Sequence, residues 1–230
     1  PLLLAHYSSG ITILCIPVLF AMLTSKLMQM VYGFSYVEGI VPMEYPFLWI
    51  VFMTIVAFTF TTFMAICSGT TFDTIISCFV ICGSSCILIL CGNEVISHIL
   101  PGYRGTYGLS SLIITAFSPY AAAYVPLFFS YQEPSYSLEF FLWWTFVLIV
   151  LFVFSLVLYY RRKSECAENN FAFPIPKILI RFFATFSSAL LGGLILTYLN
   201  SNWFNFFLGA LLASLCAHFI AEAVYSRGFK

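Results

Sequence analysis

The chain contains six runs of about twenty predominantly apolar residues, and this pattern limits what it can fold into. A helix of about 20 apolar residues crosses the hydrocarbon core of a bilayer, whereas soluble domains carry roughly 25% charged residues. Here 62% of the residues are hydrophobic and 8% are charged. We therefore predict an all-α integral membrane protein whose residues 1–230 form a single transmembrane domain. The expected helices are residues 9–30, 46–66, 75–96, 138–160, 182–199 and 203–223.

A polar stretch with three adjacent cations follows the fourth of these runs and predicts the orientation of the chain. Cations at the end of a span are retained on the cytoplasmic side, because their translocation is costly and the cytoplasmic surface attracts them. We therefore interpret residues 161–181 as a cytoplasmic junction and expect the carboxyl end of this multi-pass protein to be cytoplasmic. The candidate partner-facing residues of the junction are Arg161, Arg162, Lys163, Glu165 and Glu168.

Residues 112–129 leave two topologies open, because this apolar stretch contains Pro119 and Pro126. As a full span it would make seven helices, and as a re-entrant element shielded by the bundle it leaves six. With six spans, seven of the nine Lys and Arg residues face the cytoplasm, and with seven spans all nine do. The charge distribution slightly favours seven spans, whereas the two prolines and the short length favour six.

The amino end and the net charge indicate how the chain begins and which partners it can have. The chain begins at Pro1 without a basic region or a cleavage site typical of a signal peptide, so we expect a domain that is truncated at its amino end. The formal net charge is zero, which argues against nucleic acid as a partner and leaves the lipid bilayer as the surrounding medium.

Four ionisable residues fall within or at the ends of the apolar runs and are candidate intramembrane polar sites. Such residues indicate function by default. Glu94 and His98 lie at the end of a run, where they can reach interfacial water, and this favours an ordinary structural role. His218 and Glu222 lie one turn apart, and we interpret them as an interhelical polar pair rather than a proton relay.

Small residues recur every four positions in the last two runs, which are joined by three residues. Such repeats let the backbones of neighbouring membrane helices approach closely. We therefore predict that these runs pack against each other as a hairpin. The candidate packing residues are Ala184, Ser188, Gly192, Gly209, Ala213 and Ala217.

Motifs for chemistry are weak in this sequence. Cys78, Cys82 and Cys86 recur at one-turn spacing and could bind Cu(I), but no cluster of His or Met accompanies them, so close helix packing is the favoured interpretation. There is no phosphate-binding Gly-rich loop with Lys, no H-E-x-x-H and no G-x-S-x-G. We predict no catalytic, metal or cofactor-binding residues in this chain and no enzymatic activity of its own.

Several short motifs together resemble a known family. They are a helix with an internal proline at Pro17, two runs joined by Ser68-Gly69-Thr70-Thr71, a Ser118-Pro119 element, and a Tyr-Arg-Arg-Lys-Ser-Glu-x-Ala-x-x-x-Phe-Ala-Phe junction over residues 160–173. Over roughly residues 9–181 the chain resembles ABC-2-type permease subunits. More narrowly, it resembles permeases of Gram-positive exporters associated with bacitracin, lantibiotics and cell-envelope stress.

This resemblance implies a membrane permease in a bacterial plasma membrane that pairs with a second copy or a sister permease. ATP and Mg would be bound by a separate cytoplasmic ABC ATPase, and the exporter would move an amphipathic substrate such as a peptide antibiotic or a lipid-like molecule, with a role in antibiotic resistance. The resemblance also favours six spans with a re-entrant extracellular element.

Two other functions are open from the sequence. An ion-coupled secondary carrier would use Glu94, His98, His218 and Glu222 as proton sites. A non-transporting structural subunit of a membrane complex would use the hairpin of the last two runs as a docking element.

Overall fold

The structure, a computed structural model, describes residues 2–32, 44–100, 103, 113–123, 138–161, 174–199 and 202–226. These residues are helical apart from short connections. Within these ranges, six helices are long and apolar enough to cross a bilayer. The predicted all-α polytopic membrane fold is therefore confirmed.

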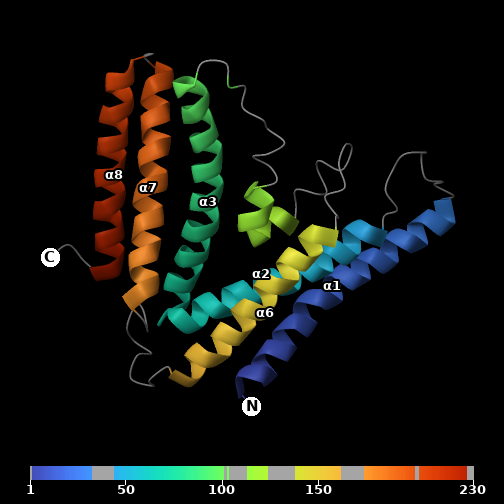
Figure 1. The fold of residues 1–230 in the computed structure, drawn as a ribbon. Coiled ribbons are helices and arrows are strands. Elements are labelled where there is room, and N and C mark those ends of the chain that lie inside the picture. Colours follow the sequence, from blue (N-terminus) through green and yellow to red (C-terminus); the bar gives the residue numbers. More distant parts are fainter. Residues whose placement is uncertain are drawn as a thin grey trace. The chain divides into compact units, whose positions relative to one another are not determined.

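Each predicted run falls within one long helix (Figure 1). The largest difference is at the fifth run, whose helix begins at Pro174, eight residues before the predicted start. Proline is tolerated in a first helical turn, because the N–H groups there have no acceptor within the helix. The long helices are α1 (Leu2–Tyr32), α2 (Glu44–Cys67), α3 (Thr71–Ile99), α6 (Leu138–Arg161), α7 (Pro174–Leu199) and α8 (Trp203–Ser226).

The described part of the stretch 112–129 consists of two short helices, residues 113–117 and 119–123, separated by Ser118. Five helical residues rise about 7.5 Å, far less than the roughly 30 Å of a bilayer core. Residues 113–123 are therefore not a seventh span, and Pro119 explains the break, because a proline keeps the preceding residue out of the helical conformation. Residues 124–129 lie outside the described part of the chain.

The described chain divides into two compact units, which are considered separately. One unit comprises the described residues of Pro1–Phe63 and Pro119–Val157, and it contains α1 and most of α2 and α6. The other comprises those of Met64–Ser118 and Leu158–Lys230, and it contains α3, α7 and α8.

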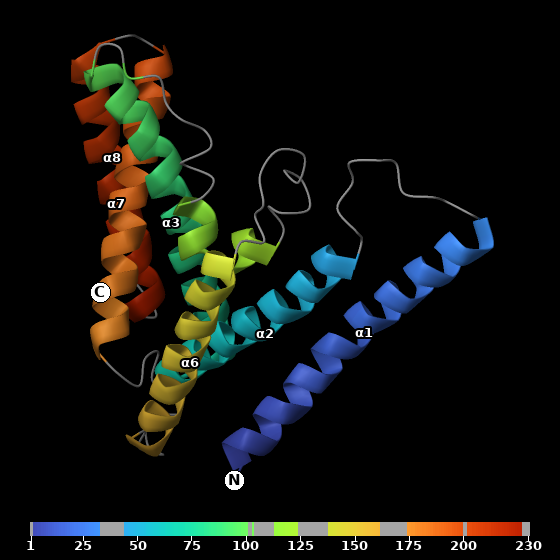
Figure 2. The ribbon, with the colours of Figure 1, turned by 45° about the vertical axis from the view of Figure 1, so that its right-hand side comes forward.

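In the second unit, α3, α7 and α8 lie side by side in both ribbon views, with α7 in contact with each of the other two (Figure 1 and Figure 2). The tightest contact joins α7 and α8 at Gly192 and Gly209. A Cβ atom added to Gly192 would lie 2.8 Å from the carbonyl oxygen of Gly209 and closer still to the Cβ of Ala213. The two backbones can approach this closely only because glycine has no side chain.

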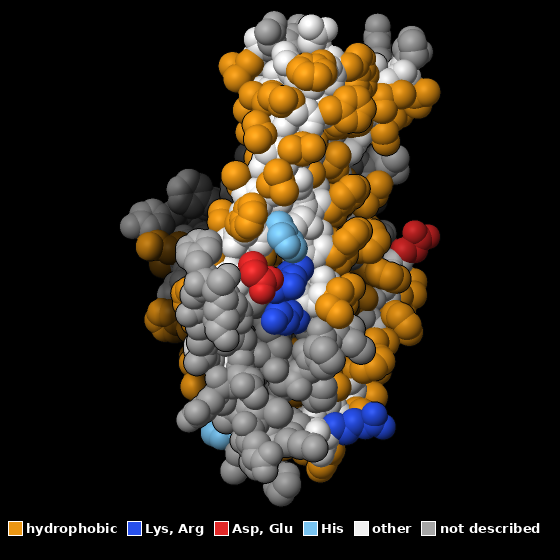
Figure 3. Space-filling view, turned by 90° about the vertical axis from the view of Figure 1, so that its left-hand side faces the viewer, with side chains coloured by type: hydrophobic (Ala, Val, Ile, Leu, Met, Phe, Trp, Pro, Cys, Tyr) orange, Lys and Arg blue, Asp and Glu red, His pale blue; other side chains and the backbone are white. Residues whose placement is uncertain are grey.

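The outer surface of the helices is apolar, as expected for side chains that face lipid. Figure 3 shows one face on which hydrophobic side chains predominate among the described residues, with one small group of charged side chains and a few isolated ones. Large residues such as Phe79, Phe204 and Ile220 are mostly exposed. Buried positions, by contrast, include several hydroxyl residues, among them Thr59, Ser68 and Ser187. This inverted arrangement follows because lipid gives apolar side chains no reason to leave the surface, whereas polar groups need internal partners.

The hydroxyl groups of α2 show how such partners are found. Thr54, Thr59, Thr61 and Thr62 each donate a hydrogen bond of 2.7–2.8 Å to the carbonyl four residues earlier. A hydroxyl bonded in this way costs little in an apolar medium. Thr59 also shares a 2.6 Å hydrogen bond with Tyr7, which connects α1 to α2 in the first unit.

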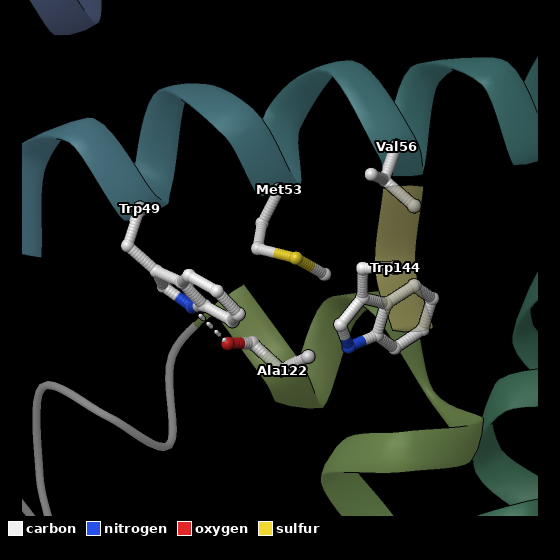
Figure 4. Close-up of a cluster of buried hydrophobic side chains, with 5 residues drawn as sticks. All are labelled: Trp49, Met53, Val56, Ala122 and Trp144. Atoms are coloured by element: carbon white, nitrogen blue, oxygen red, sulfur yellow. Dashed lines mark hydrogen bonds between the residues drawn. The ribbon is translucent and has the colours of Figure 1, made fainter. Parts of the chain in front are cut away.

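The core of the first unit is built on two tryptophans (Figure 4). Trp49, Met53 and Val56 lie on one face of α2, and they pack with Trp144 of α6 and Ala122 of the short helix 119–123. The indole Nε1 of Trp49 donates a 2.8 Å hydrogen bond to the carbonyl oxygen of Ala122. This bond ties the short helix to α2 and satisfies both buried polar groups.

We predict that Gly192→Ala destabilises the α7–α8 hairpin by about 1–3 kcal/mol, because its methyl group collides with backbone, and this exceeds the gain of about 1 kcal/mol in helix propensity. The measurement is the thermal unfolding midpoint of the purified protein in detergent. The control is Gly83→Ala on α3, where an added Cβ meets nothing within 4 Å and stability should stay equal or rise. Equal losses in the two variants would contradict the close contact.

We expect Trp49→Phe to cost about 1–3 kcal/mol of stability, because the carbonyl of Ala122 loses its indole donor in a buried site. The same unfolding assay measures this loss. Trp143→Phe is the matched control, since Trp143 lies beside Trp144 in the sequence but is exposed. The unfolding midpoint of this variant should barely change.

Candidate functional site

A cleft of about 220 Å³ lies where α3 and α7 end and α8 begins, and it belongs wholly to the second unit. These three helix ends lie at the same end of the bundle (Figure 1 and Figure 2). The lining residues are Val95, His98, Leu194, Thr197, Tyr198, Asn202, Trp203 and Phe206.

The length of α3 places this cleft at a membrane surface. The helix has 29 residues and is therefore about 43 Å long, which exceeds the roughly 30 Å hydrocarbon core. If the helix is centred in the bilayer, about 7 Å of it projects into the headgroup region at each end, so His98 lies in that region and Val95 lies at its boundary. Tyr198 and Trp203 suit this depth, because Tyr and Trp concentrate at membrane interfaces.

The ends of α3 and α8 are fixed by local hydrogen bonds. At the end of α3 the N–H of Leu100 donates to the carbonyl of Ile96 over 2.9 Å, and the Tyr103 hydroxyl donates to Asn93 Oδ1 over 2.9 Å. At the start of α8 the carbonyl of Asn202 accepts from the N–H of Asn205 over 3.0 Å. The cleft therefore has a defined rim.

Aromatic side chains form the apolar wall of the cleft. The rings of Trp203 and Phe206 meet edge to face with centroids 6.0 Å apart. Phe206 in turn lies against Gly193 of α7, where an added Cβ would come within 2.7 Å of the ring. The small residue on α7 thus makes room for the large one on α8.

Polar groups complete the cleft. The hydroxyl of Tyr198 donates a 3.5 Å hydrogen bond to Glu94 Oε2, which joins the end of α7 to α3. Glu94 lies one turn before His98, so the carboxylate and the imidazole lie on the same side of α3. Among the described lining residues there is no Lys or Arg. An imidazole and three aromatic rings line a small amphipathic space, and the Glu94 carboxylate adjoins it through Tyr198.

The other two predicted polar residues lie near the opposite end of α8, where Glu222 forms a salt bridge with Arg181 of α7. Both side chains are partly exposed, and His218 is exposed one turn before Glu222. The interhelical partner of Glu222 is therefore Arg181, on the neighbouring helix. The register of the hairpin could have indicated this, because Arg181 and Glu222 are nearly equidistant in sequence from the turn between Leu199 and Trp203.

The predicted packing residues lie on the facing helices α7 and α8. Gly192 meets Gly209 and Ala213 directly. Ala184 is half-buried, and its carbonyl accepts hydrogen bonds from the hydroxyls of Ser187 and Ser188. Ala217 is half-buried on α8. Gly193 and Phe206 form a second close contact between the two helices.

Of the predicted cytoplasmic junction, only Arg161 and the α7 residues from Pro174 onward are described. Arg161 is exposed at the end of α6. Arg162, Lys163, Glu165 and Glu168 lie outside the described residues, so their role as a partner-facing surface stays a prediction.

A buried acid at the start of α3 was not predicted from the sequence. The Asp73 carboxylate accepts a 2.6 Å hydrogen bond from the hydroxyl of Thr70, and the Thr70 oxygen accepts from the N–H of Asp73 over 3.2 Å. The spacing Thr-x-x-Asp is that of a capping box, and this motif was the available signal. Asp73 therefore stabilises the helix start.

No group of three or more His, Cys, Asp and Glu residues that could hold a metal ion occurs in the described ranges. Cys78 and Cys82 are buried in α3, where side chains of this size suit helix packing.

Comparisons with models of protein families, with curated proteins and with solved structures found no match to this chain. The fold and the cleft define the class of an all-α polytopic membrane protein. The resemblance to ABC-2-type permeases remains a prediction.

We predict that the Arg181–Glu222 pair is structural. Glu222→Gln should then cost at most about 1 kcal/mol, as is typical of an exposed pair, and the charge-swapped variant Arg181→Glu with Glu222→Arg should recover most of that loss. Unfolding in detergent, measured as a double-mutant cycle, checks this. If Glu222 instead belonged to a proton relay, the swapped variant would have no carboxylate at position 222. Its proton-coupled transport would then be lost even though its stability recovered.

Proposed function

We propose that this chain is the membrane-spanning subunit of a transporter, and more specifically the permease of an ATP-driven exporter of amphipathic molecules. On this proposal it lies in a bacterial plasma membrane, pairs with a second copy or a sister permease, and is coupled to a separate cytoplasmic ABC ATPase that binds ATP and Mg.

The observation that carries the proposal is the amphipathic cleft among α3, α7 and α8, set in a chain whose described part contains six helices able to span a bilayer. Ligand sites commonly lie between the helices of bundles and combine an apolar lining with a few placed polar groups. The cleft has this composition and lies where cargo would meet the membrane surface.

The topology supports the same proposal. If the carboxyl end of α6 is cytoplasmic, as the cations after Tyr160 predict, then α7 begins and α8 ends on the cytoplasmic side. The cleft, at the other end of these helices, then faces outward. An outward-facing cleft suits the release of exported cargo.

The test is to purify the protein with its associated ATPase in mild detergent and to measure ATP hydrolysis in lipid vesicles. We expect hydrolysis several-fold faster in the complex than in the isolated ATPase, because coupling to the permease activates the enzyme. A chain that purifies alone and supports substrate flux in an ion gradient would instead establish a secondary carrier.

Charge reversal in the predicted junction sharpens this test. We expect Arg162→Glu with Lys163→Glu to reduce stimulated ATP hydrolysis several-fold while the protein still inserts with its carboxyl end in the cytoplasm. Insertion is measured by the accessibility of a carboxyl-terminal tag. Lys26→Glu, in α1, is the matched control and should leave the stimulation unchanged. If the tag became inaccessible from the cytoplasm while the ATP hydrolysis of correctly inserted protein stayed stimulated, these cations would determine only the orientation of the chain.

A further inference from the structure

We propose that the cleft among α3, α7 and α8 binds the ammonium group of an amphiphile, with Glu94 as its counter-charge and Trp203, Tyr198 and Phe206 as its aromatic walls. The inference rests on the proposed function, since it names the class of molecule that the permease would handle.

The charge of the cleft favours a cation. The carboxylate of Glu94 adjoins the cleft through its hydrogen bond with Tyr198, and the described lining residues include no Lys or Arg that would compete with a bound cation for this carboxylate.

The partial charges at the helix ends also favour a bound cation. The carboxyl ends of α3 and α7 and the amino end of α8 meet at the cleft. A helix carries partial negative charge at its carboxyl end and partial positive charge at its amino end. The amino end of α8 offsets one of the two carboxyl ends, so a net negative contribution remains.

The aromatic walls suit an ammonium group better than a neutral head. The face of Trp, and less strongly of Tyr or Phe, attracts a cation within about 6 Å of the ring centroid. Trp203 meets Phe206 edge to face, and about half of the Trp203 side chain is exposed, so its ring is accessible to a ligand. Gly193 supports this arrangement, because a side chain there would displace Phe206.

The position of the cleft identifies the rest of the molecule. Val95 and Leu194 line the cleft on the side away from the helix ends, and the length of α3 predicts that the rim lies at the headgroup depth. A molecule with an ammonium head at the surface and an alkyl chain in the lipid matches both regions. A soluble amphiphile and the headgroup of a bilayer lipid share this chemistry.

The test is equilibrium binding of labelled decyltrimethylammonium to the full chain in nanodiscs of phosphatidylglycerol, a lipid without an ammonium group. Neither ATP nor a partner is present, so a failure to bind is distinct from a failure of ATP-driven transport. We expect saturable binding that unlabelled decyltrimethylammonium displaces and that uncharged decyl maltoside displaces at least about tenfold less well.

Two variants test the named groups. Glu94→Gln keeps an oxygen for the Tyr198 hydroxyl but removes the charge, and it should weaken binding about tenfold. Trp203→Leu keeps an apolar side chain but removes the aromatic face, and it should weaken binding about three- to thirtyfold. Glu94→Asp should restore part of the affinity.

The matched controls are Glu139→Gln and Trp143→Leu in the first turns of α6, where the same residue types lie exposed outside the cleft. Their affinities should equal that of the unmodified chain. Unchanged binding in Glu94→Gln, or equal losses in the α6 controls, would overturn the proposal. So would equal displacement by decyl maltoside.

The source of the ammonium group is distinguished by repeating the assay in phosphatidylcholine nanodiscs. If the lipid headgroup occupies the cleft, the difference in probe affinity between the unmodified chain and Glu94→Gln should shrink several-fold. If the cleft takes a soluble amphiphile, the difference should persist.

Discussion

The close contact of Gly192 with Gly209 is the interaction on which the second unit depends. It brings the backbones of α7 and α8 together, and the features at both ends of the hairpin follow from that spacing. At one end Phe206 rests on Gly193 and lines the cleft, and at the other Arg181 reaches Glu222. In lipid, where apolar burial supplies little driving force, such backbone proximity replaces the hydrophobic core of a soluble protein.

Much of the fold could be predicted from the sequence, because a bilayer imposes a simple requirement. Backbone groups must be satisfied within each segment, so long apolar runs become helices, and the six predicted runs coincide with the six long helices. The break at residues 112–129 was harder to assign. The charge distribution slightly favoured a seventh span, but Pro119 sterically ends the helix that precedes it. Residues 113–123 therefore form two short helices and no span.

The site was only half predictable. Glu94 and His98 stand out because ionisable residues are rare in apolar runs, yet Trp203 and Phe206 look like ordinary lipid-facing aromatics. Their role depends on which helices are neighbours, and a single sequence does not give the contact of α3 with α7. The pairing of Arg181 with Glu222 was within reach, since the short turn fixes the hairpin register. Asp73 lies just before the predicted run 75–96, because polar residues interrupt the apolar pattern there although the spacing Thr-x-x-Asp marks a helix start.

The short turn between α7 and α8 also has a consequence for how the hairpin assembles. Three residues extend at most about 10 Å, so the end of α7 and the start of α8 cannot move far apart in the bilayer. Once both spans are in the bilayer, their ends at the turn are held together, so Gly209 meets Gly192 without a search through the lipid.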